Sequence, residues 1–112
     1  MDEFVEFVRL PLFERTAKGL LSEEEVRRLE RDLMANPRKG DVEDGTGGVR
    51  KVRAAIGGGG KTGGARVLYM YAEERSKIYL LLAFRKNVQP ALTAAQKKAL
   101  RELSARLKME AR

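Results

Sequence analysis

Three strand-like segments separated by short turns restrict the possible folds more than any other feature of this sequence. They are "VRKVRAAI" (Val49–Ile56), "ARVLYMYA" (Ala65–Ala72) and "KIYLLLAF" (Lys77–Phe84), and each is rich in β-branched and aromatic residues. Only "GGGGKTGG" and "EERS" separate them. Connections this short join antiparallel neighbours, so the sequence predicts an antiparallel meander.

The N-terminal third predicts one more strand and two helices. Glu3–Leu10 reads as a first strand, and Pro11–Gly19 reads as a short helix with Pro at its first turn and Gly at its end. Ser22 and Glu25 have the spacing of a capping box, which predicts the start of a second helix. Pro37 ends that helix.

The C-terminal segment predicts a third helix. Thr93 and Gln96 have the spacing of a second capping box, and an apolar stripe follows: Leu100, Leu103 and Leu107. The predicted order is β-α-α-β-β-β-α in a single α+β domain, residues 1–112. We expect a four-stranded antiparallel sheet with the two N-terminal helices on one face. The other face would then be open for function.

The composition excludes several kinds of chemistry. The chain has no Cys and no His, so it has no disulfide, no Cys/His metal site and no Ser–His or Cys–His catalytic pair. We therefore expect neither a metal nor a cofactor. The longest apolar run, Ile78–Phe84, is far too short to span a membrane, and the acidic "MDEFVEF" is no signal peptide. The cytoplasm is the default location.

The stretch "AIGGGGKT" (Ala55–Thr62) resembles a phosphate-binding P-loop, but its context does not. A P-loop leads into a helix whose N-terminus faces the phosphates. Here the following "GGARVLYMY" predicts a strand, and the first motif position is Ala55 instead of Gly. A flexible hairpin loop and a loop that closes over a polyanion remain as interpretations.

Positive charge is segregated along the chain. The formal net charge is +7, and the five charged residues from Gly45 to Ala72 are all basic: Arg50, Lys51, Arg53, Lys61 and Arg66. Lys51 and Arg53 share a strand face, since side chains alternate with a period of two. Arg85 and Lys86 end the last strand near the same edge. A solvated face usually mixes charge signs, so this strip favours a polyanionic partner.

Such a strip has the groups that RNA cleavage requires. A base must take the proton of the 2′-hydroxyl, cations must stabilise the crowded phosphate, and an acid must protonate the leaving oxygen. Lys can act as a base beside other cations, and Arg binds phosphate bidentately. Tyr69 and Tyr71 could stack on bases, although strand tyrosines more often pack in the core.

These residues resemble a known family. The blocks "GTGGVRKVRAA", "GGGKTGGARVLYMY", "IYLLLAFRKN" and "LTAAQKKAL" are similar to those of the RelE/ParE toxin superfamily, and above all to its HigB-type branch of bacterial type II toxin–antitoxin systems. The resemblance extends over nearly the whole chain. It implies the fold predicted above and ribosome-dependent cleavage of mRNA in the A site, which leaves a cyclic phosphate and a 5′-hydroxyl.

The resemblance also implies site residues and partners. The catalytic set would be Lys51, Arg53, Arg66 and Lys86, and RNA-binding residues would be Arg50, Lys61, Tyr69 and Arg85. A cognate helix-turn-helix antitoxin would mask the basic face and alone connect the toxin to operator DNA. Aromatic residues that family members often carry are replaced by Ala54 and Ala65. ParE-like inhibition of DNA gyrase and non-catalytic binding of nucleic acid are the alternative functions.

Overall fold

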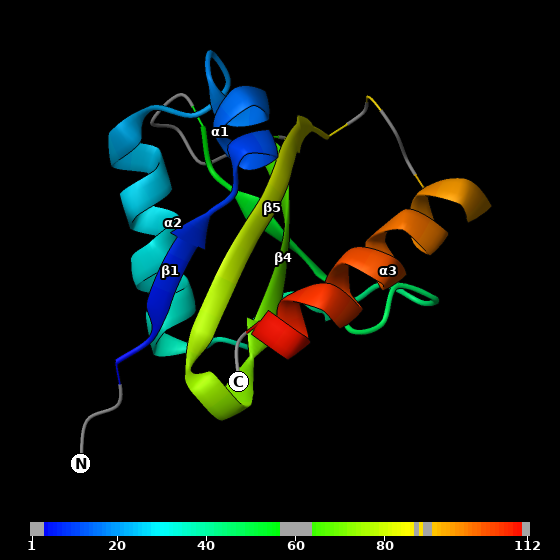
Figure 1. The fold of residues 1–112 in the computed structure, drawn as a ribbon. Helices are drawn as coiled ribbons and strands as arrows, with labels where there is room; N and C mark the ends of the chain where they lie inside the picture. The colour runs from blue at the N-terminus through cyan, green and yellow to red at the C-terminus, as the bar shows by residue number, and fades with distance from the viewer. Residues whose placement is uncertain (1–3, 57–63, 87, 89–90, 111–112) are drawn as a thin grey trace.

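The computed structural model describes residues 4–56, 64–86, 88 and 91–110, which fold into one mixed sheet with helices on both faces (Figure 1). The elements are β1 (Glu6–Arg9), α1 (Pro11–Ala17), α2 (Glu23–Ala35), β2 (Asp41–Val42), β3 (Arg50–Ala54), β4 (Ala65–Ala72), a 3-10 turn (Glu73–Arg75), β5 (Lys77–Arg85) and α3 (Ala94–Glu110). None of the helices in these ranges is long and apolar enough to cross a membrane.

The sheet differs from the prediction in two details. Its order is β1-β5-β4-β3-β2, so it has five strands, and β2 is a two-residue strand inside the segment predicted to be a loop. Strand β1 pairs with β5 in parallel, so the expectation of a purely antiparallel sheet was wrong. The physical reason is that α1 and α2 separate β1 from the other strands. A strand at the end of so long a connection is free to pair in either direction.

Helices α1 and α2 cover one face of the sheet, as predicted. Phe13 and Ala17 from α1, and Val26, Leu29 and Leu33 from α2, are buried against the sheet. The sheet contributes a second set of buried side chains: Val52, Ala54, Ala65, Val67, Tyr69, Ile78, Leu80 and Ala83. Burial of these side chains supplies the main driving force for folding, since each of those larger than Ala contributes on the order of 1.5–3 kcal/mol.

Helix α3 lies on the opposite face of the sheet, which was predicted to be open (Figure 1). Buried Leu107 packs there with a second cluster from the strands and the loop before β3: Val49, Leu68, Met70, Ala72, Tyr79 and Leu81. The side chains of Leu100 and Leu103 are partly buried against the same cluster. The expectation of an uncovered second face was therefore wrong for the part of the sheet under α3, because these strands alternate between two apolar faces.

Both predicted capping boxes are present. The Ser22 hydroxyl accepts a hydrogen bond from the Glu25 N–H (3.1 Å), and the Glu25 carboxylate accepts one from the Ser22 N–H (2.8 Å). Thr93 and Gln96 make the same reciprocal pair before α3, with distances of 3.1 and 2.9 Å. Each box satisfies backbone donors that a helix start leaves free.

Helix α3 is also attached to the loop between β2 and β3. Donors on three successive turns reach carbonyl oxygens of that loop: Arg101 Nη1 binds the Gly45 oxygen (2.6 Å), while Ser104 Oγ and Lys108 Nζ bind the Gly47 oxygen (both 3.0 Å). Gly45 and Gly47 have positive φ angles of 77° and 75°, which turn these carbonyls toward the helix at little cost because Gly has no Cβ. The loop thus joins α3 to the start of β3.

Candidate nucleic-acid interface

Three cations lie together on the α3 side of strands β3 and β4. In the strand register Arg53 is directly opposite Arg66, and Lys51 is opposite Leu68. Phe84 on β5 continues the row that contains the two arginines. A hollow of about 450 Å³ is bounded by Lys51, Arg53 and Arg66 together with residues 39–41. The structure therefore brings together three of the four residues assigned to catalysis.

The cationic strip has two acidic neighbours that come from outside the segment Gly45–Ala72. Asp41 on β2 lies opposite Lys51 in the register, and the Glu43 carboxylate is 3.6 Å from the Lys51 ammonium. Both acids precede the strip in sequence, so inspection of Gly45–Ala72 alone could not find them. The pairing of β2 with β3 places them beside Lys51. Arg53 is exposed and makes no ion pair with any residue in the described ranges.

Arg50 lies apart from these three cations. It belongs to the opposite strand face, and its Nη1 donates to the carbonyl oxygens of Gly40 (2.6 Å) and Arg38 (3.2 Å). This guanidinium therefore ties the segment after α2 to β3. Its expected contact with RNA stays a prediction, now with a structural role beside it.

Tyr69 does not face a ligand. Its side chain is fully buried in the core under α1 and α2, with its hydroxyl donating to the Pro37 oxygen (2.8 Å) and accepting from the Gly40 N–H (2.9 Å). Burial raises the pKa of this phenol. The assignment of Tyr69 to RNA binding was wrong, because strand alternation puts it on the face opposite Lys51, Arg53 and Arg66.

The remaining predicted residues lie at the end of the sheet where β4 begins. Arg85 is exposed and pairs with Ala65 in the register, and Lys86 is exposed just past β5, with its N–H bound to the Gly64 oxygen (3.1 Å). Lys61 lies outside the described residues. Strand β4 begins at Ala65, directly after Gly64, so the helix required by a P-loop is absent there.

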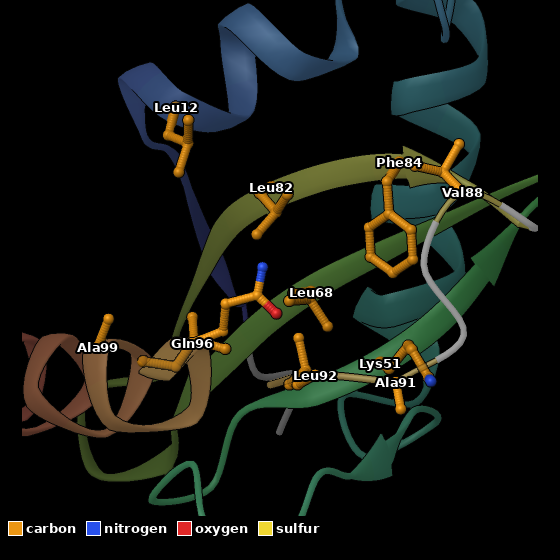
Figure 2. Close-up of a pocket in the computed structure, with 11 residues that line it drawn as sticks. Leu12, Lys51, Leu68, Leu82, Phe84, Val88, Ala91, Leu92, Gln96 and Ala99 are labelled. Atoms are coloured by element: carbon orange, nitrogen blue, oxygen red, sulfur yellow. The ribbon is translucent and has the colours of Figure 1, made fainter. Parts of the chain in front are cut away.

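An apolar pocket of about 270 Å³ adjoins the cations (Figure 2). Leu68, Leu82 and Phe84 of the sheet form its floor, and Leu92 with the first turns of α3 forms one wall. The amide of Gln96 points from α3 toward the sheet, and Lys51 lies at the rim (Figure 2). Sequence reasoning missed this pocket because its lining comes from four separate segments.

The chemistry open to this site is that of lysine and arginine. The described residues contain no group of His, Cys, Asp and Glu side chains that could hold a metal ion. Guanidinium groups stay charged at any physiological pH and bind two phosphate oxygens at once, and lysines can carry charge or exchange a proton. Cations of this kind on a sheet face can bind an anionic ligand such as a phosphodiester.

Comparisons with known proteins identify the family of the chain. Residues 9–112 match the family model described as "RelE toxin of RelE / RelB toxin-antitoxin system". The chain therefore belongs to the RelE toxin family. Among solved structures, a double arginine-to-alanine mutant of the E. coli toxin RelE in the free state is similar, with a TM-score of 0.53 and 14% sequence identity. The match covers 78% of this chain and 88% of that one, and it supports a common fold.

Proposed function

We propose that this toxin cleaves mRNA on the ribosome and so inhibits translation. The observation that carries the proposal is the direct opposition of Arg53 and Arg66, with Lys51 on the same strand face. Like charges at directly opposed positions of a strand pair repel each other unless an anion lies between them. A phosphodiester with two non-bridging oxygens is the anion that suits two arginines.

The proposed reaction is an internal transfer at phosphorus. A base removes the proton of a 2′-hydroxyl, the resulting oxyanion attacks the adjacent phosphorus, and the bond to the 5′-oxygen breaks. The 5′-oxygen takes up a proton, which gives a 2′,3′-cyclic phosphate and a 5′-hydroxyl. Arg66 would hold the scissile phosphate and Arg53 would stabilise its growing charge, while Lys51 or Lys86 would be the base.

A cognate antitoxin is the proposed protein partner. The family description supports an antitoxin in general, and the resemblance of the sequence to the HigB-type branch suggests one with a helix-turn-helix. The apolar pocket beside Lys51 is compatible with a protein partner, since exposed apolar patches that adjoin charged groups are typical of protein interfaces. Operator DNA would then be reached only through the antitoxin.

The test is a cleavage assay in a translating extract. The double variant Arg66→Ala/Lys86→Ala should leave the mRNA intact and remove growth arrest on induction, with circular dichroism unchanged. Arg28→Ala is the matched control, because Arg28 is an exposed arginine on α2 on the opposite face of the sheet. A double variant as toxic as the native chain would contradict the assignment.

The two alternatives predict other outcomes in the same experiment. A ParE-like toxin would block supercoiling by purified gyrase and leave mRNA uncut. A non-catalytic nucleic-acid-binding domain would be harmless when it is induced. The direct opposition of Arg53 and Arg66 suits a phosphodiester with two non-bridging oxygens, which favours the ribonuclease.

A further inference from the structure

Glu43 is an acidic side chain placed inside an otherwise cationic site. Its carboxylate lies 3.6 Å from the Lys51 ammonium, and the two side chains are only 19% and 30% exposed. An acid near a phosphate-binding surface weakens binding by repulsion, so its presence there requires a compensating role. Pairs this far from solvent are also screened less than surface pairs.

The backbone of Glu43 is held on both sides. Its N–H donates to the Val49 oxygen (2.8 Å), and its carbonyl accepts from the hydroxyl of fully buried Thr46 (2.6 Å). The same hydroxyl accepts from the Val49 N–H (3.1 Å). Beyond Thr46, the Gly47 carbonyl is bound by Ser104 of α3. Hydrogen bonds thus fix the backbone that carries the Glu43 carboxylate, and they connect it through the loop to α3.

The other charged groups around Lys51 come from three elements. Asp41 of β2 lies opposite it, Arg53 follows it on the same face of β3, and Arg66 lies opposite Arg53 on β4. From α3, Gln96 is neutral, and Lys97 lies near Gly45. Arg53 and Arg66 repel the Lys51 ammonium, while Asp41 and Glu43 attract it. Glu43 is the partner with which Lys51 forms its ion pair.

We propose that Glu43 is a positioning residue: its carboxylate holds Lys51 as a fixed ammonium beside Arg53 and Arg66. Lys51 then acts as a third cation on the phosphate and not as the acceptor of the 2′-hydroxyl proton. The base would be Lys86, an exposed residue just past β5 that forms no ion pair with any described residue. This inference rests on the proposed ribonuclease function and distinguishes between the two lysines left open above.

The test compares cleavage with binding in Glu43→Gln, which keeps the shape of the side chain and removes its charge. Single-turnover cleavage of ribosome-bound mRNA should fall about 10- to 100-fold, the usual effect of a misplaced catalytic group. Affinity for the same message carrying uncleavable 2′-O-methyl groups should be unchanged or higher, because one repulsive charge is gone. In a Lys51→Ala background the Glu43→Gln change should cause no further loss of cleavage.

Glu24→Gln is the matched control, because Glu24 pairs with Arg31 at the same distance of 3.6 Å on the surface of α2. It should change neither cleavage nor binding. Faster cleavage in Glu43→Gln would show that the acid only repels RNA, and a parallel loss of cleavage and binding would show a merely structural role. Either result overturns the inference. A native chain that binds programmed ribosomes and never cuts would instead contradict the proposed ribonuclease itself.

Discussion

Arg53 on β3 lies directly opposite Arg66 on β4, on the strand face that also carries Lys51. Like charges at directly opposed positions of an antiparallel pair destabilise a sheet by roughly 0.2–1 kcal/mol. A fold that keeps such a pair gives up stability at this position. A position at which the sequence departs from such a rule of sheet stability is expected to have a functional role.

The first prediction follows from this repulsion. Replacing Arg53 with Gln should raise the free energy of unfolding by a few tenths of a kcal/mol, because the exposed side chain loses no ion pair and Arg66 loses a like-charged neighbour. The same change should lower mRNA cleavage about 100-fold through lost stabilisation of the phosphate. Urea unfolding and the extract assay measure the two effects.

Arg28→Gln on α2 serves as the control for both measurements. It should alter neither stability nor cleavage. Loss of both properties together in Arg53→Gln would mean that Arg53 has a structural role, and the functional interpretation of the opposed arginines would then fail.

Local signals in the sequence predicted the elements that depend on neighbouring residues. Strand β4 occupies Ala65–Ala72 as predicted, and both capping boxes form, because propensity and capping act over a few residues. The parallel pairing of β1 and the two-residue strand β2 depend on tertiary contacts alone. No short stretch of sequence carries that information.

The candidate site was predictable only in part for the same reason. Alternation along β3 placed Lys51 and Arg53 on one face, and Arg66 joined them from the next strand. Tyr69 is three residues from Arg66 on β4, so alternation places it on the other face, and its assignment to RNA binding did not apply this rule. Glu43 approaches Lys51 only because β2 folds back against β3.

The second prediction concerns the Tyr69 hydroxyl. Tyr69→Phe should lower the free energy of unfolding by about 1–3 kcal/mol, because it leaves the Gly40 N–H and the Pro37 oxygen without their shared partner in a buried place. Urea denaturation measures the change. Tyr71→Phe is the control, because the Tyr71 ring is partly exposed and its contact with Arg38 is made by the ring face, which the change leaves in place.

The third prediction concerns the stability that the fold loses at alkaline pH because the phenol of Tyr69 ionises. Burial raises the pKa of Tyr69 above its ordinary value of 10.0, so the folded state holds this proton more tightly than the unfolded state. The corresponding stability is complete below about pH 10 and is lost as pH rises through the higher value. Tyr69→Phe should lose less stability than the native chain between about pH 9 and pH 11. Equal slopes in the two proteins would contradict this.

The fourth prediction tests the attachment of α3 to the loop before β3. Ser104 is 1% exposed and donates to the Gly47 oxygen, so Ser104→Ala should cost on the order of 1 kcal/mol. Hydrogen exchange should speed up in α3 and in the loop while the strands stay protected. Arg106→Ala on the exposed side of the same helix should leave exchange unchanged. Uniform deprotection of the whole chain would argue against a local attachment.

The fifth prediction concerns the N-terminal edge of the sheet, where Arg9 binds Glu23 and Glu30 with N–O distances of 2.9 Å. The hydrogen bond from Arg9 lowers the pKa of Glu23 below its ordinary 4.5. Because the folded pKa is the lower one, the stability from this contact is present above about pH 4.5 and is lost as pH falls through the depressed value. The melting temperature of Glu23→Gln should therefore lie below that of the native chain at neutral pH and converge with it as the pH falls through the depressed pKa. Glu24→Gln is the control, because it leaves the contacts of Arg9 unchanged, and its melting temperature should vary with pH as that of the native chain does. If the melting temperature of Glu23→Gln stayed below the native value at acidic pH, lost packing and not lost charge would be responsible.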